Sequence, residues 1–275
     1  MTARELEGCT ILITGGNGYL GSELARELAR GGADIVIAYF VESGLDALLD
    51  ELRGIGVRAA GVFMDVRDWD SVEAGFRTAE KELAAPTGVI ACSAVQENVE
   101  AGEIPPDVFR QVIETNVTGT ANAFEIGLRN LPRSRNDVPR FLGAIGSVTA
   151  RQSFPGLALY GATKNFVDGL VRTYAAPAAR IGARTWSLRP GAIPHPGKER
   201  ETPGYTEAWK SFGLLDRVGT PQDVAAACRF LAGPHAAHIT GAMLDVDGGN
   251  GLVWTPPIRE VQTPEESKAR LAGIQ

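Results

Sequence analysis

Short hydrophobic runs alternate along the chain with longer stretches in which apolar residues recur every three or four positions. Residues 9–14 predict a strand, and residues 20–32 place Leu20, Leu24 and Leu28 on one helical face before a Gly-Gly stop. Similar runs predict six further strands, at residues 34–40, 58–66, 88–95, 140–148, 183–191 and 242–249. The stretches between them predict helices at residues 45–56, 71–84, 107–129, 158–180 and 221–232.

Strict alternation of strands and helices predicts an α/β fold of the Rossmann type, with a doubly wound, seven-stranded parallel sheet and helices on both faces. The strands are apolar throughout, as burial on both faces requires. Because no linker interrupts the rhythm, residues 1–275 are predicted to form a single domain. Residues 192–216 are rich in Pro, Gly and charge and predict a flap with one short helix. Residues 250–275 predict a tail whose "TPEESKARL" begins like a capped helix.

Composition narrows the functional classes. The net charge is -6, from 33 acidic and 27 basic residues, and this balance argues against a nucleic-acid partner. Three cysteines without a CxxC pair argue against a disulfide framework or a metal site and suit a reducing compartment. No targeting segment and no apolar run long enough to span a bilayer is visible, so we expect a cytoplasmic protein with no membrane contact.

A glycine-rich turn, "GGNGYLG", follows the first predicted strand and opens the first predicted helix. The spacing Gly16-x-Gly18-x-x-Gly21 in that context is typical of a dinucleotide-binding loop, in which the pyrophosphate sits at a helix N-terminus. The alternative is an ordinary glycine turn. The predicted cofactor contacts in this segment are Gly15, Asn17, Gly18, Tyr19, Leu20 and Gly21.

Candidate catalytic groups lie further along the chain. Tyr160 and Lys164 are four residues apart on a predicted helix and therefore share a face. We expect the ammonium to lower the phenol pKa from its ordinary value near ~10, which would make Tyr160 a general acid/base at neutral pH. Ser147 ends a predicted strand, thirteen residues before Tyr160, at the sheet edge where ligands of parallel sheets bind. Each feature alone also fits a surface pair or a strand-end turn.

In combination, these segments resemble the short-chain dehydrogenase/reductase family over about residues 8–250. "TGGNGYLG" is similar to the loop of the family's extended branch, since Tyr19 stands where the compact single-domain branch has glycine. The Ser…Tyr-x-x-x-Lys spacing and the segments "RPGAIPH", "RVGTPQDVAAACRFLAG" and "ITGAMLDVDGG" match the compact branch instead. We therefore interpret the chain as a compact-branch member with an extended-like glycine loop.

The resemblance implies a role for each matching residue. Asn116 matches the asparagine that holds a proton-relaying water, and with Ser147, Tyr160 and Lys164 it completes the catalytic tetrad. Lys164 is also expected to hold the cofactor ribose. The further cofactor contacts that the resemblance implies are Asp65, Val66, Ser93, Ala94, Tyr160, Pro190, Gly191, Ile193 and His195.

Two segments depart from the family pattern. Residues 91–94 read Ala-Cys-Ser-Ala where the family has Asn-Asn-Ala-Gly, and we interpret Cys92 as a buried strand residue. His195 replaces a threonine that bonds the nicotinamide carboxamide. It is expected to make that bond through a ring N–H, to contact substrate or to face solvent, and the sequence leaves all three open.

Cofactor choice depends on the end of the second strand. Tyr39 stands there, with neither an acid nor a base directly after it. Tyr39 is a predicted cofactor contact. Its presence together with Ser43 resembles NADP-tolerant members of the family, whereas Glu42 would repel a 2′-phosphate. Between NADP and NAD, we favour NADP.

The predicted function is an NAD(P)-dependent oxidoreductase that interconverts a carbonyl and a secondary alcohol of a small-molecule substrate. An epimerase, a dehydratase or another enzyme without net redox is the alternative that the glycine loop suggests, and a non-catalytic nucleotide sensor is a third. Tyr205, Trp209 and Phe212 of the flap are candidates for lining a pocket for an apolar or ring-bearing substrate, or for packing the flap itself. The resemblance also implies a homo-oligomer, a tetramer or a dimer, formed through the helices that hold Asn116 and Tyr160.

Overall fold

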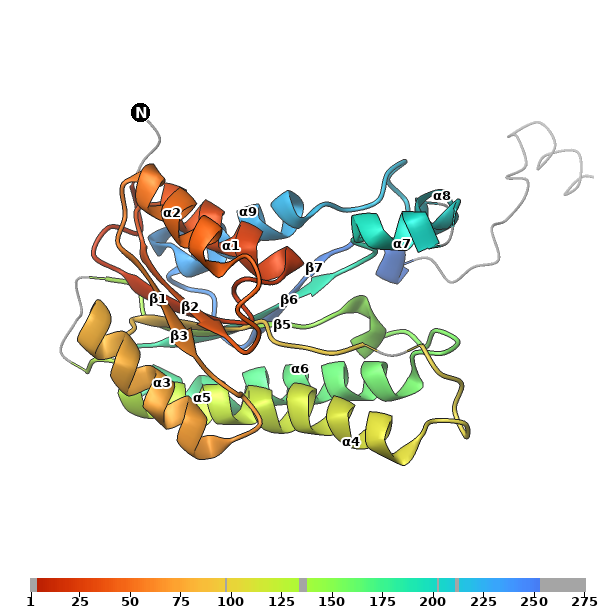
Figure 1. The fold of residues 1–275 in the computed structure, drawn as a ribbon, viewed down its shortest axis with the longest axis horizontal. Coiled ribbons are helices and arrows are strands. Elements are labelled where there is room, and N and C mark those ends of the chain that lie inside the picture. The colour runs from red at the N-terminus through yellow and green to blue at the C-terminus, as the bar shows by residue number, and fades with distance from the viewer. Residues whose placement is uncertain (1–3, 97, 134–137, 202, 211–212, 253–275) are drawn as a thin grey trace, which may run out of the picture.

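The computed structural model describes residues 4–96, 98–133, 138–201, 203–210 and 213–252. Its centre is a seven-stranded parallel sheet with the strand order β3-β2-β1-β4-β5-β6-β7 (Figure 1). The strands are β1 (Thr10–Thr14), β2 (Asp34–Tyr39), β3 (Ala59–Phe63), β4 (Gly88–Ala91), β5 (Phe141–Ile145), β6 (Arg184–Pro190) and β7 (Ala242–Val246). The prediction of a doubly wound parallel sheet is confirmed.

Helices cover both faces of the sheet (Figure 1). One layer contains α1 (Tyr19–Arg30), α2 (Leu45–Ile55) and α9 (Pro221–Ala232). The other contains α3 (Trp69–Glu82), α4 (Pro106–Ile113), α5 (Gly119–Asn130) and α6 (Ala158–Ala179). Because all seven strands are parallel, their carboxyl ends meet at one edge of the sheet.

The sheet separates two hydrophobic cores. Alternate strand residues point to opposite faces, so that Ile11 and Ile13 join the core under α1 and α9, whereas Leu12 joins the core under α5 and α6. The expectation that every strand is buried on both faces is wrong for the two edge strands. Phe63 at the end of β3 and Leu244 in β7 are 56% and 39% exposed, because an edge strand has a neighbour on one side only.

Two predicted helical regions differ in detail. The single helix expected at 107–129 is interrupted by a π-helical turn, η1 (Glu114–Thr118), which separates α4 from α5. The flap contains two short helices instead of one, α7 (Pro196–Glu201) and α8 (Tyr205–Lys210), and both lie beyond the carboxyl ends of β6 and β7 (Figure 1). The helix predicted within "TPEESKARL" lies outside the described residues.

Short 3-10 turns complete the described chain: η2 (Val148–Ala150), η3 (Pro234–Ala236) and η4 (Asn250–Leu252). Within the described ranges, no helix has the length and apolar character to cross a membrane. The same ranges hold no group of three or more His, Cys, Asp or Glu side chains arranged for a metal ion.

Candidate active site

The glycine loop connects β1 to α1 and leaves the start of that helix open. Gly18 is the N-cap, no side chain caps the helix, and its first turn contains no acidic residue. The first N–H groups of α1 are therefore available to an anion, and no carboxylate repels one. Gly15 has a φ of +62°, and a Cβ on Gly21 would lie 2.3 Å from the Gly15 carbonyl oxygen, so the loop closes this tightly only with glycine at both positions.

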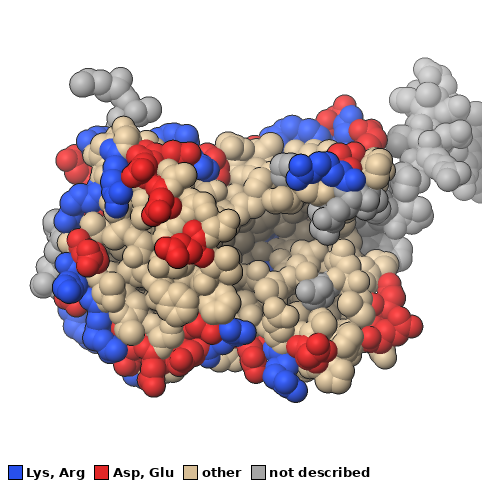
Figure 2. Space-filling model, in the orientation of Figure 1, with Lys and Arg blue, Asp and Glu red and all other residues tan. Residues whose placement is uncertain are grey.

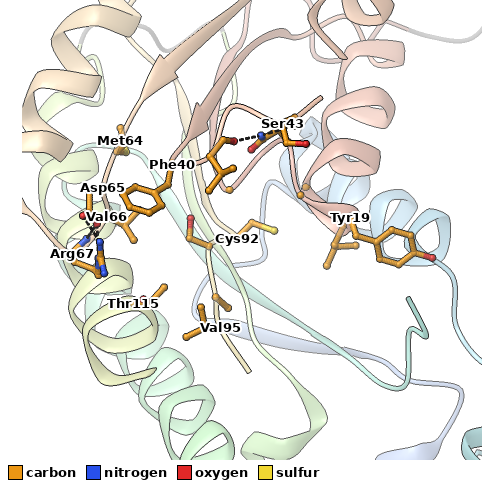
Figure 3. A pocket seen from close by; sticks show the side chains of 18 of the residues that line it. Tyr19, Phe40, Ser43, Met64, Asp65, Val66, Arg67, Cys92, Val95 and Thr115 are labelled. Carbon is orange, nitrogen blue, oxygen red and sulfur yellow. Dashed lines mark hydrogen bonds and ion pairs between the residues drawn. The ribbon is translucent and has the colours of Figure 1, made fainter. Parts of the chain in front are cut away.

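A cavity of about 550 Å³, here called the long groove, runs along this loop and across the ends of β1, β2, β3 and β4. Tyr19 lies at one end of the groove, and Phe40, Asp65 and Arg67 lie at the other (Figure 3). The lining residues are Gly15, Asn17, Gly18, Tyr19, Leu20, Gly21, Phe40, Val41, Ser43, Met64, Asp65, Val66, Arg67, Cys92, Ser93, Ala94, Val95, Gln111 and Thr115.

The far end of the long groove combines an aromatic ring with an ion pair. The Arg67 guanidinium donates two hydrogen bonds to Asp65, at 2.8 and 2.7 Å, and lies 5.1 Å from the centre of the Phe40 ring (Figure 3). This pairing lowers the pKa of Asp65, chiefly through the hydrogen bonds from Arg67. Sequence reasoning missed Phe40 and Arg67, although both adjoin residues that it selected.

Tyr39, a predicted cofactor contact, does not line the long groove. Tyr39 packs against the core under α1 and α2 and meets the Phe63 ring edge-on at 6.1 Å, whereas Phe40, Val41 and Ser43 line the groove. The physical reason is strand alternation, which turns neighbouring side chains to opposite faces. Of these two neighbours, Phe40 therefore lines the long groove and Tyr39 does not, and the cofactor contact of Tyr39 stays a prediction.

A second cavity of about 240 Å³, here called the aromatic pocket, adjoins the first, because Tyr19 and Leu20 line both. A hollow is visible on this face in Figure 2, bordered mostly by side chains other than Lys, Arg, Asp and Glu. The residues that line the pocket are Tyr19, Leu20, Gln96, Ile145, Gly146, Ser147, Val148, Thr149, Phe154, Leu157, Tyr160, Pro190, Gly191, Ala192, Ile193, Tyr205 and Trp209. Both predicted flap aromatics within the described chain are among them; Phe212 lies outside it.

Ser147 and Tyr160 meet in the aromatic pocket. Ser147 directly precedes η2, and its Oγ accepts a hydrogen bond from the Thr149 N–H at 3.1 Å, which fixes the side chain at the end of β5. Burial raises the pKa of Tyr160 to about 12, although a hydrogen bond with Ser147 acts in the opposite direction. The expectation of a lowered phenol pKa is therefore wrong for the chain as it stands: Tyr160 is a protonated donor at neutral pH.

Lys164 lies beneath Tyr160, one helical turn further along α6. Its side chain is buried, its Nζ donates to the Ile145 carbonyl at 2.8 Å, and that nitrogen lies 5.4 Å from the centre of the Tyr160 ring. Burial lowers the pKa of Lys164 to about 8, against the opposing influence of Cys92 and Asp168. Lys164 lines neither cavity, and Tyr160 is the catalytic side chain on which its ammonium can act.

Asn116 sits in the π-helical turn and is 1% exposed. Its Oδ1 accepts from the Val95 N–H, and its Nδ2 donates to the Val95 carbonyl, both at 2.9 Å. The same Nδ2 donates to Thr163 Oγ1 at 3.1 Å, and that hydroxyl donates to the Tyr160 carbonyl at 2.7 Å. Asn116 thus ties the segment after β4 to the turn of α6 that bears Tyr160. Thr163 is a third residue that sequence reasoning missed, after Phe40 and Arg67.

The altered segment after β4 still lies against the glycine loop. Thr14 Oγ1 accepts hydrogen bonds from the N–H groups of both Cys92 and Ser93, each at 3.1 Å. Burial raises the pKa of the Cys92 thiol to about 11, so it is neutral and unreactive at ordinary pH. Cys92 is nevertheless only partly buried and lines the long groove, so its interpretation as a buried strand residue is incomplete.

Tyr19 of the glycine loop and His195, which both depart from the family pattern, contact each other. The rings of Tyr19 and His195 meet edge-on, with centres 4.7 Å apart, and the Tyr19 hydroxyl donates to the Pro194 carbonyl at 3.3 Å. His195 Nδ1 accepts from the Gly197 N–H at 3.0 Å, and His195 lines neither cavity. This contact joins the glycine loop to the start of the flap. Such a role for His195 is not among the three alternatives that the sequence left open.

The residues present fit a dinucleotide. An uncapped helix start faces the long groove, a Cβ at Gly21 would fill the turn, and an aromatic ring with a guanidinium closes the far end. The long groove shares Tyr19 and Leu20 with the aromatic pocket, which Tyr160 lines, so a dinucleotide site and a proton donor lie in adjoining cavities.

Comparison with known proteins agrees with this geometry. A family model described as enoyl-(acyl carrier protein) reductase matches residues 18–250. Galactitol 2-dehydrogenase (L-tagatose-forming) from Cereibacter sphaeroides is 34% identical over 92% of this chain and 98% of its own. Cis-4-hydroxycyclohexanecarboxylate dehydrogenase from Sinomonas cyclohexanicum is 32% identical over 86% of this chain and 94% of its own.

A solved short-chain type dehydrogenase/reductase from Mycobacterium marinum shares the fold, with a TM-score of 0.81 and 24% identity over 90% of this chain and 96% of its own. The chain belongs to the short-chain dehydrogenase/reductase family. It is an NAD(P)-dependent oxidoreductase that interconverts carbonyls and secondary alcohols, as the named relatives indicate.

Proposed function

We propose that the long groove holds NADP and that Tyr160 transfers the proton when a ketone in the aromatic pocket is reduced. The observation that carries this proposal is that the long groove adjoins the pocket lined by Tyr160, since Tyr19 and Leu20 line both cavities. The bound reduced dinucleotide supplies a hydride to the carbonyl carbon. The C=O π pair moves to oxygen, which takes the phenol proton and becomes a hydroxyl.

Each residue of the tetrad has a separate task in this proposal. Ser147 donates to the substrate oxygen and orients it, and Tyr160, protonated because its pKa is raised, donates the proton. Lys164, still largely an ammonium at neutral pH, stabilises the phenolate that remains. Asn116 positions this group by tying Val95 to Thr163, next to both catalytic side chains in α6.

The preference for NADP rests on the far end of the long groove. Phe40, Val41 and Ser43 line it without an acid, and the acid that does line it, Asp65, is already paired with Arg67. Arg67 can turn toward a 2′-phosphate, while Glu42 does not line the groove. Titration with both dinucleotides tests this: we expect tighter binding of NADPH, and an Arg67→Ala change that weakens NADPH more than NADH.

The remaining cofactor contacts divide between the cavities. Gly15, Asn17, Gly18, Gly21, Val66, Ser93 and Ala94 line the long groove, and Pro190, Gly191 and Ile193 line the aromatic pocket near the expected nicotinamide. His195 lines neither cavity, and in this proposal it supports the glycine loop through its contact with the Tyr19 ring.

Net oxidation or reduction distinguishes this function from the epimerase alternative. Mixing the full chain with NADPH and a ketone is expected to consume NADPH in proportion to alcohol formed. An epimerase or dehydratase would change the substrate while the dinucleotide concentration stays constant. Tight dinucleotide binding without turnover of any carbonyl would indicate a sensor.

We further propose a homotetramer that works in the cytoplasm. Phe109 on α4 and Phe166 on α6 are large and exposed on the helices through which the assembly is expected to form. All three cysteines are free thiols, which suits a reducing compartment. Sedimentation of the purified chain tests the assembly, and replacement of Phe166 by a charged residue is expected to dissociate it.

A further inference from the structure

The aromatic pocket has walls without charge. None of the described residues that line it is Asp, Glu, Lys, Arg or His. Its polar side chains are neutral: they include Ser147 and Tyr160, beside which the reacting oxygen would lie, and Tyr19, Gln96, Thr149 and Tyr205. A buried carboxylate or phosphate would find no counter-ion on these walls, and an unpaired charge is costly to remove from water.

Two charged groups of the flap, Glu199 and Lys210, have partners of their own. The Glu199 carboxylate accepts from the N–H groups of Gly204 and Thr206, both at 2.8 Å, at the start of α8. The Lys210 ammonium pairs with Asp216 at 3.1 Å. These contacts hold α8 in place, so that its aromatic side chains form a wall of the pocket.

Two distant segments build this aromatic wall. Phe154, in the loop before α6, lies 5.8 Å from Trp209 between ring centres, and Tyr205 lies 6.1 Å from Trp209. The rings are tilted by 46° and 56°, so they present a faceted apolar surface instead of a flat stack. Such a surface favours a compact ring whose C–H groups meet several aromatic faces at once.

The pocket volume sets an upper size. About 240 Å³ is below the roughly 300–1,000 Å³ of pockets for drug-sized ligands. A small ring with one carbonyl group fits this space, whereas a long acyl chain would extend out of it.

We propose, on the basis of the function proposed above, that the substrate is a small, uncharged cyclic ketone or the matching secondary alcohol. The ring lies against Phe154, Tyr205 and Trp209, and the carbonyl oxygen points toward Ser147 and Tyr160. The lack of charge on the walls excludes carboxylated and phosphorylated analogues, and the aromatic wall selects a ring over an open chain.

Three ketones matched in size test this proposal with the full chain and NADPH. They are 4-methylcyclohexanone, the open-chain seven-carbon ketone 2-heptanone, and the anion 4-oxocyclohexanecarboxylate, with the methyl ester of the last as a neutral control. We expect kcat/KM for the neutral rings to exceed that for the anion by ~100-fold or more and that for 2-heptanone by ~10-fold. A preference for the anion or for the open chain would overturn the proposed substrate class and leave the oxidoreductase function standing.

Variants of the wall separate binding from folding. Trp209→Ala is expected to raise KM for 4-methylcyclohexanone by roughly 10- to 30-fold with a smaller change in kcat, and Trp209→Phe to restore most of the loss. Trp69→Ala removes the same side chain from α3, outside both cavities, and should leave that KM unchanged. Equal effects of the Trp209 and Trp69 changes would refute the role of the wall. Failure to reduce any of the four ketones, despite dinucleotide binding, would instead overturn the proposed function itself.

Discussion

The long groove and the aromatic pocket share Tyr19 and Leu20 but are built in different ways. The groove consists of strand ends and a glycine turn close together in the sheet, and its main features are backbone groups and a single ion pair. The pocket joins a loop before α6, the end of β6 and helix α8, and its main features are apolar side chains. A family can therefore keep the first nearly constant for one cofactor while the second changes with each substrate.

Removing the phenol hydroxyl should have the largest effect, because Tyr160 is the proposed proton donor in the aromatic pocket. Tyr160→Phe is expected to lower kcat/KM for ketone reduction by roughly 10²–10⁴-fold, since the ring remains but the proton donor is lost. The dissociation constant for NADPH, measured by fluorescence titration, should stay nearly the same.

Tyr174→Phe is the matched control for that change. Tyr174 lies on the same helix, and its hydroxyl donates to Glu125 at 2.6 Å, far from both cavities. This control should keep its activity. A Tyr160→Phe enzyme as active as the control would refute the assigned proton donor.

A methyl group in the glycine turn should damage the groove selectively. Gly21→Ala places a Cβ 2.3 Å from the Gly15 carbonyl oxygen, a backbone atom that cannot move without opening the turn. We expect the dissociation constant for NADPH to rise ~10-fold or more, and the free energy of unfolding to fall by about 1–3 kcal/mol.

Gly54→Ala makes the same chemical change in α2, where no atom lies within 4 Å of the new Cβ. Helix propensity predicts an unchanged or slightly more stable protein with normal cofactor binding. Similar losses of NADPH affinity in both variants would show that the tight turn is not the cause.

The pH profile should show the buried ammonium. Burial lowers the pKa of Lys164 to about 8, so the ammonium is complete well below pH 8 and is lost as the pH rises through that value. Ketone reduction should therefore fall above about pH 8, by up to tenfold per pH unit, while Tyr160, with a pKa of about 12, stays protonated. A flat profile to pH 10 would contradict this role of Lys164.

The contact between Tyr19 and His195 should have the smallest effect. Tyr19→Ala removes both the ring contact and the hydrogen bond to Pro194, and we expect a ~3- to 10-fold rise in the dissociation constant for NADPH. Tyr19→Phe keeps the ring contact and should lose less, because the hydrogen bond is long and lies at the surface. If Tyr19→Ala and Tyr19→Phe raise the dissociation constant for NADPH equally, the contact between the Tyr19 and His195 rings does not contribute to cofactor binding.

The two cavities also differ in how far the sequence predicted them. Glycines at fixed spacing and short apolar strands depend on local rules, so the sheet, the glycine turn and the positions of Ser147, Tyr160 and Lys164 could be predicted. Local rules did not indicate Phe40, the neighbour of Tyr39, which strand alternation places in the long groove.

The other features that the sequence did not predict depend on tertiary contacts. The partnership of Phe154 with Trp209 and the edge-on contact of Tyr19 with His195 join segments far apart in the chain. The raised pKa of Tyr160 follows from burial, which spacing along a helix does not reveal. No periodic pattern encodes such contacts, because they depend on how the flap folds over the sheet edge.

A crystal structure of the full chain with NADP and 4-methylcyclohexanol is the most direct test of the central claim, that one dinucleotide site and one ketone site meet at Tyr160. We predict the adenine beside Phe40 and Arg67, the pyrophosphate at the start of α1, and the alcohol oxygen within hydrogen-bond distance of both Ser147 and Tyr160. A dinucleotide bound elsewhere, or an alcohol oxygen remote from Tyr160, would contradict the account.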